Sequence, residues 1–106
     1  MVNHYRNQDG LDTHARIRHV IRRFAGRDWG AAWDTSPPMR SRVVTLWKKE
    51  EWKEVHSFVV DQRTLASVLE DVEGNRWTVV TAHFHHEVGK RRRQVRRLVR
   101  ALEAAA

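Results

Sequence analysis

A histidine cluster followed by a run of basic residues is the part of this sequence best suited to chemistry. His83, His85 and His86 end an apolar segment, and the residues from 88 to 106 contain seven Lys or Arg and one acid. This stretch carries six of the seven net positive charges, so residues 1–87 are close to neutral. Imidazole and guanidinium groups both donate hydrogen bonds to phosphate oxygens. The arrangement therefore predicts contact with a phosphate-containing ligand.

The basic residues lie on a predicted helix from about Val88 to Ala104, which turns by 100° per residue. One arc of this helix is basic and comprises Lys90, Arg93, Arg96, Arg97 and Arg100. The opposite stripe is apolar and comprises Val88, Val95, Leu98, Val99 and Leu102. The functional interpretation is a sequence-independent contact with the phosphate backbone of nucleic acid. The alternative is the solvated face of an ordinary amphipathic helix in a basic protein.

The histidines allow three interpretations. On a strand, His83 and His85 would point to the same face, and such a pair can bind Zn²⁺ or Ni²⁺ if a third ligand is near. Glu87 and His56 are the candidates for that third ligand. His83 could instead contact a phosphate group, or the cluster could be structural or simply exposed.

Composition limits the class of protein. A chain of 106 residues, 41% hydrophobic and with five Trp, is expected to form one folded domain, residues 1–106. The absence of Cys excludes disulfides and thiolate chemistry. No segment has the length and apolar character of a membrane span or a secretory signal, which predicts a cytoplasmic protein without membrane contact.

The order of elements follows from periodicity. A helix is expected from Asp12 to about Ala25, with Gly26 as its stop, followed by an irregular segment from Trp29 to Pro38. Four alternating or apolar runs predict strands, the third of which could also be helical. These predicted strands are Arg42–Lys48, Trp52–Val60, Thr64–Val72 and Arg76–Thr81.

Two of these segments resemble the endonuclease/exonuclease/phosphatase superfamily, which has the DNase I-like fold. Thr81-Ala82-His83 approximates the Thr-His that ends a hairpin in that family, and the helix after it matches the pattern R-x-x-Q-x-x-x-L-x-x-x-L. The matching helix residues are Arg91, Gln94, Leu98 and Leu102. The resemblance also covers the hairpin formed by residues 42–49 and 52–55 and the helix from residue 12 to residue 24. It implies a Mg²⁺- or Mn²⁺-dependent phosphodiesterase in which His83 contacts the scissile phosphate.

The resemblance covers only the central part of such an enzyme. The metal-binding Glu of the family would precede the first helix, where this chain has Met1-Val2, and the Gly-Asp-x-Asn strand would follow Ala106. The sequence is therefore expected to be a truncated, minimal or split member that is incomplete as a catalyst alone. The alternative function is a non-catalytic domain that binds nucleic acid or protein through its basic helix.

The expected fold class is α+β, with a mainly antiparallel four-stranded sheet and two helices on one face. In the intact family a second sheet would cover the other face. Without that second sheet, apolar pairs such as Val43/Val79 and Leu46/Val80 would be exposed to solvent in this chain. This exposure predicts a homodimer or a partner chain over the open face.

Overall fold

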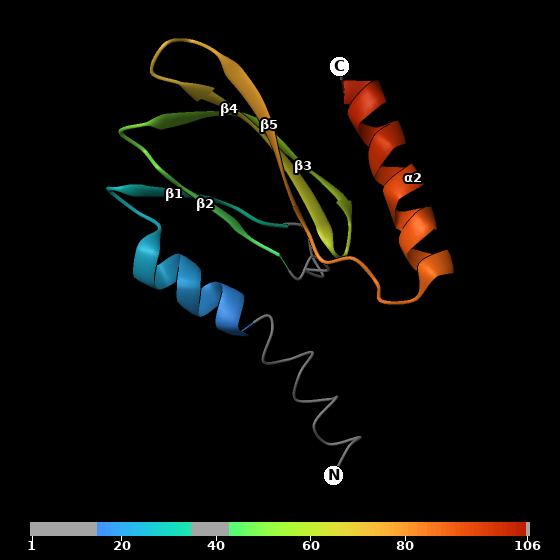
Figure 1. Ribbon diagram of the computed structural model, residues 1–106. Helices are drawn as coiled ribbons and strands as arrows, with labels where there is room; N and C mark the ends of the chain where they lie inside the picture. Colours follow the sequence, from blue (N-terminus) through green and yellow to red (C-terminus); the bar gives the residue numbers. More distant parts are fainter. Residues whose placement is uncertain (1–14, 35–42, 106) are drawn as a thin grey trace.

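The computed structural model describes residues 15–34 and 43–105. Within this part, residues 15–24 are helical and five strands and another helix follow, so the α+β class is confirmed (Figure 1). The strands are Trp29–Ala32 (β1), Thr45–Lys48 (β2), Trp52–Asp61 (β3), Thr64–Asp71 (β4) and Arg76–Ala82 (β5). The second helix is Val88–Ala105 (α2).

The helix at residues 15–24 ends where the sequence predicts. The N–H of Ala25 donates to the carbonyl of Ile21 (2.8 Å), and Gly26 then adopts a φ of 152°, which glycine reaches without a steric penalty. Ile17 of this helix is buried, but Phe24 is 47% exposed, so the apolar residues of the helix are only partly covered. The predicted start at Asp12 lies outside the described residues.

Three strands form one antiparallel sheet in the order β3-β4-β5. Both connections are tight hairpins, and the second turns at Gly74, whose φ is 86°. Asp71 organises that turn, because its carboxylate accepts hydrogen bonds from the N–H groups of Glu73 and Asn75 and from the indole of Trp77. The Trp77 bond, followed by those backbone donors, lowers the pKa of Asp71 below its ordinary value. The interpretation of residues 64–72 as a strand is confirmed.

The prediction of one four-stranded sheet is wrong. β2 does not pair with β3. It pairs antiparallel with β1, a strand that lies inside the segment expected to be irregular. The sequence of β1, WGAA, contains little of the β-branched content that favours strands, so tertiary pairing determines its conformation. Gly30 pairs with Trp47, and a Cβ at Gly30 would overlap the indole of Trp47. The glycine therefore lets the large ring lie over β1.

The two sheets pack against each other and share a core. Ala32 and Trp47 from the two-stranded sheet meet Leu65 and Leu69 from β4, and partly buried Val43, Trp52 and Val79 complete the cluster. The hydroxyls of Thr45 and Thr81 also form a hydrogen bond across the layers (2.6 Å). The face expected to be open is therefore covered within the chain by β1 and β2. Val43 and Val79, one of the pairs expected to be exposed, pack against this core, and the homodimer or partner chain stays a prediction.

The two helices do not share one face. α2 lies on the side of the three-stranded sheet away from β1 and β2, whereas the helix at residues 15–24 lies beside β1 and β2 (Figure 1). This placement explains why β4 is buried along residues 64–67, since both of its faces are covered. α2 turns Gln94 inward, and Val95 and Val99, about 100° and 140° around the helix from Gln94, are 40% and 46% exposed.

Candidate anion-binding site

A cavity of about 300 Å³ lies where the β3–β4 turn meets the first turns of α2. Its lining is strongly basic, with four cationic side chains and one carboxylate. The lining residues are Asp61, Gln62, Arg63, His85, Lys90, Arg93, Gln94 and Arg97. The site therefore combines two chain segments that are about thirty residues apart in sequence, and its excess of positive charge suits an anionic ligand.

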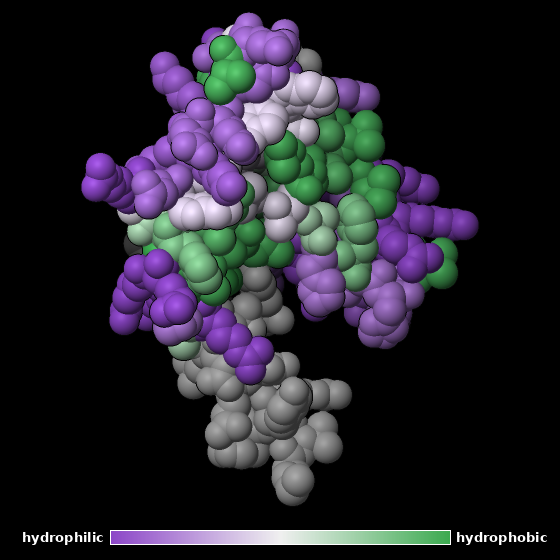
Figure 2. Space-filling view, turned by 60° about the vertical axis from the view of Figure 1, so that its left-hand side comes forward, coloured by the Kyte–Doolittle hydropathy of each residue, from purple (hydrophilic) through white to green (hydrophobic). Residues whose placement is uncertain are grey.

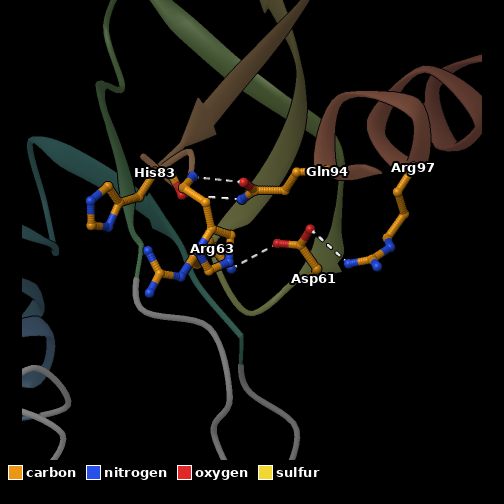
Figure 3. A network of polar contacts seen from close by, with 6 residues as sticks. Asp61, Arg63, His83, Gln94 and Arg97 are labelled. Atoms are coloured by element: carbon orange, nitrogen blue, oxygen red, sulfur yellow. Dashed lines mark hydrogen bonds and ion pairs between the residues drawn. The ribbon is translucent and has the colours of Figure 1, made fainter. Parts of the chain in front are cut away.

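Asp61 connects the two sides of the cavity. It ends β3, and its side-chain Oδ1 accepts a hydrogen bond from the N–H of Arg63 (2.8 Å), which closes the turn. Its Oδ2 forms an ion pair with Nη1 of Arg97 at 3.3 Å. The Asp61 side chain is only 13% exposed, whereas that of Arg97 is 58% exposed. Figure 3 shows Asp61 between Arg63 and Arg97, so the carboxylate orients a guanidinium that still reaches solvent.

Gln94 attaches α2 to the segment after β5. Its Oε1 accepts a hydrogen bond from the N–H of His85 (3.0 Å), and its Nε2 donates to the carbonyl of His83 (3.1 Å). Gln94 is 4% exposed, so both bonds are shielded from water. The pair of bonds sets the position of the helix and hence of the basic residues that face the cavity (Figure 3).

The histidines separate in the structure. β5 ends at Ala82, so His83 and His85 lie after the strand. Strand geometry therefore does not direct their side chains to the same face. His85 is half-buried and lines the cavity. His83 is exposed, donates its backbone N–H to the carbonyl of Arg63 (2.8 Å), and points its imidazole away from Gln94 (Figure 3).

The environment of His85 keeps it neutral near pH 7. Burial is the largest cause that lowers the pKa of His85, and the positive charges of Arg63 and Lys90 lower it further. Glu87 opposes this effect, but it forms an ion pair with Lys90 at 2.9 Å. The hydrogen bond from Lys90, and then its charge, lower the pKa of Glu87. A neutral imidazole can both donate and accept a hydrogen bond in this cavity.

The predicted basic arc is divided by the fold. Lys90, Arg93 and Arg97 line the cavity, whereas Arg96 and Arg100 are exposed on α2 outside it. Arg63 also lines the cavity, although it is not among the predicted site residues. Its only sequence signal is its place in the short Asp-Gln-Arg turn between two predicted strands, and such turns gather at sheet ends where sites are built.

The residues of the site do not fit the Mg²⁺ or Mn²⁺ that the resemblance implies. Among residues 15–34 and 43–105, no group of three or more His, Cys, Asp or Glu side chains is arranged to hold a metal ion. Asp61 is the one carboxylate in the cavity lining that the structure describes, and it is paired with Arg97. His83 and His85 likewise lack a third ligand within this part of the chain.

In the described part of the chain, neither helix combines the length and apolar character needed to cross a membrane. No protein-family model matches the sequence, no curated protein matches it, and no solved structure matches the fold.

Proposed function

We propose that this protein binds nucleic acid through its phosphate groups, using the cavity between the β3–β4 turn and α2 as the principal contact. The observation that carries the proposal is the convergence of Arg63, Lys90, Arg93 and Arg97 around a single carboxylate. Guanidinium groups bind phosphate oxygens in a bidentate manner, and such charge-assisted hydrogen bonds are about twice as strong as neutral ones.

The geometry favours a backbone contact over base recognition. Asp61 and Gln94 hold the basic side of α2 in place, so less side-chain entropy is lost when phosphate binds. Arg96 and Arg100 extend the positive surface along the same helix. Contacts of this kind position a nucleic acid without reading its sequence, and they weaken as counterions compete at higher salt.

Fluorescence anisotropy with labelled oligonucleotides tests the proposal between 50 and 200 mM salt. The variant R93E/R97E removes two cations from the cavity, and the exposed pair Arg18 and Arg22 offers a matched control, R18E/R22E. Loss of two phosphate contacts should weaken binding at least tenfold and reduce the salt slope by about 2. An equal loss of affinity in both variants would show that binding depends only on the net charge of the protein, which would contradict the proposed site.

A second candidate is phosphodiester hydrolysis by this cavity. The observation that favours it is that Asp61 and the neutral imidazole of His85 share the cavity with four cations, which could stabilise charge in the transition state. Supercoiled plasmid incubated with the protein, with and without EDTA, tests it. Nicking that persists in EDTA and disappears in His85→Ala would support hydrolysis by these residues, whereas nicking that persists in His85→Ala would contradict a role for His85. His83→Ala tests in parallel the phosphate contact that the resemblance implies.

A further inference from the structure

Two further hollows lie around the β2–β3 turn, at the end of β3 opposite the basic cavity. One is an apolar groove of about 350 Å³ between the two sheets, and the other is a polar pocket of about 210 Å³. Trp29 and Lys48 line both of them, so the two hollows adjoin. We propose that together they form a subsite for one unpaired nucleotide, with the base in the groove and its phosphate in the pocket.

The groove has the chemistry of a base-stacking site. Trp29, Trp47 and Trp52 line it, together with Leu69 and Val79 from the three-stranded sheet. Trp29 and Trp52 are half-buried and therefore still offer ring surface to a ligand. Aromatic side chains bind single-stranded nucleic acid by stacking on bases, and stacking accepts any base because every base has a π-face. Figure 2 brings the β1–β2 side forward and shows hydrophobic surface between hydrophilic rims.

The adjoining pocket supplies the cations that a phosphate needs. Arg27, Lys48 and Lys49 line it against two acids, Asp28 and Glu50. Nζ of Lys48 lies 5.9 Å from the centre of the Trp29 ring, within the range of a cation–π contact. Lys48 thus lies at the boundary between the aromatic groove and the polar pocket. A nucleotide whose base occupies the groove would place its phosphate in the pocket, close to this cation.

The position of this subsite relative to the basic cavity suggests the class of nucleic acid. Trp52 begins β3 and Asp61 ends it, and this strand of ten residues spans about 30 Å. A base can enter the groove only when it is unstacked and unpaired, which a duplex resists. This inference rests on the proposed phosphate-binding function and adds a preference for single strands long enough to span about 30 Å over duplexes.

The test compares the affinities of a labelled (dT)12 strand and a 12-base-pair duplex. Wild type should bind the single strand about tenfold more tightly, the difference expected from one stacked base. Trp52→Leu should remove this difference, whereas Trp77→Leu, at a Trp that is 55% exposed and lies outside the groove, should preserve it. Far-UV circular dichroism establishes that each variant is folded.

Trp52 packs against the core, so its substitution also changes the packing of the protein. A second variant therefore alters an exposed charged residue instead. Lys48→Glu should also abolish the preference for the single strand, and Lys53→Glu, which makes the same charge change at an exposed site nearby, should not. Equal binding of strand and duplex by wild type, unchanged by Trp52→Leu and Lys48→Glu, would overturn the subsite and leave the proposed function intact. Absence of binding to both probes would overturn both proposals.

Discussion

His85 illustrates at the scale of a residue how burial and neighbouring charges set the chemistry of the basic cavity. Its pKa is lowered from an ordinary value near 6.5, mainly by burial and then by Arg63 and Lys90. The imidazole is therefore neutral at pH 7 and gains its proton only in more acidic solution. In the free protein this shift costs stability as the pH falls below about 6.5, because the unfolded chain then binds the proton more readily.

The same shift predicts tighter phosphate binding in acid. Below the lowered pKa, a protonated His85 adds a positive charge to the cavity and replaces a neutral hydrogen bond with a charge-assisted one. Affinity for an oligonucleotide should rise about fivefold as the pH falls from 7.5 through the lowered pKa of His85, beyond the change seen in His85→Gln. His86→Gln, at an exposed histidine next to it, is the matched control and should retain the increase. Identical pH profiles for wild type and His85→Gln would contradict this role.

At the scale of an element, α2 is positioned by polar contacts more than by its apolar stripe. Val88, Val95 and Val99 are 40–51% exposed, whereas Gln94 is the buried residue of the helix. Two hydrogen bonds to residues 83 and 85 and one ion pair to Asp61 hold the first half of α2 against the sheet. The orientation of the basic arc therefore depends on the Gln94 amide together with the Asp61–Arg97 ion pair.

Gln94→Leu should lower the free energy of unfolding by about 2 kcal/mol, because it leaves the His85 N–H and the His83 carbonyl without their partner. Urea denaturation followed by circular dichroism measures this change. Gln62→Leu serves as the control, since Gln62 is exposed on the β3–β4 turn and its substitution should cost under 0.5 kcal/mol. Amide exchange within α2 should also accelerate in Gln94→Leu, and unchanged exchange would show that other contacts hold the helix.

At the scale of the whole molecule, both sheets depend on one small core. Trp47 and Ala32 from the β1–β2 sheet pack with Leu65 and Leu69 of β4, so neither sheet buries its apolar face without the other. The basic cavity and the proposed nucleotide subsite lie at opposite ends of β3, which belongs to this shared scaffold. Loss of the core should therefore affect both sites together.

Leu65→Ala should destabilise the protein by about 2–5 kcal/mol, since Leu65 is 1% exposed and its truncation leaves a cavity. Near-UV signals from the Trp residues and far-UV signals from the backbone should still be lost in one coincident transition. Val72→Ala, at a residue that is 79% exposed on a turn, should have little effect. Two separate transitions would show that the sheets fold independently.

The sequence by itself determined the elements whose signals are local. Alternating and apolar runs were sufficient to predict β3, β4 and β5 as strands, although the third run also allowed a helix, and helical periodicity with the concentrated positive charge predicted α2 and its basic arc. The spacing of the five predicted basic residues on one helix is a local property, and three of them line the cavity.

Only the tertiary structure decided the relations between distant segments. The pairing of β2 with β1 instead of β3, the rotation of α2 about Gln94, and the choice of His85 over His83 for the cavity all depend on contacts between residues far apart in the chain. The same is true of Arg63, which reaches the basic residues of α2 only because the β3–β4 turn folds beside them. Period and propensity describe one segment at a time, so packing between segments had to determine which side chains meet.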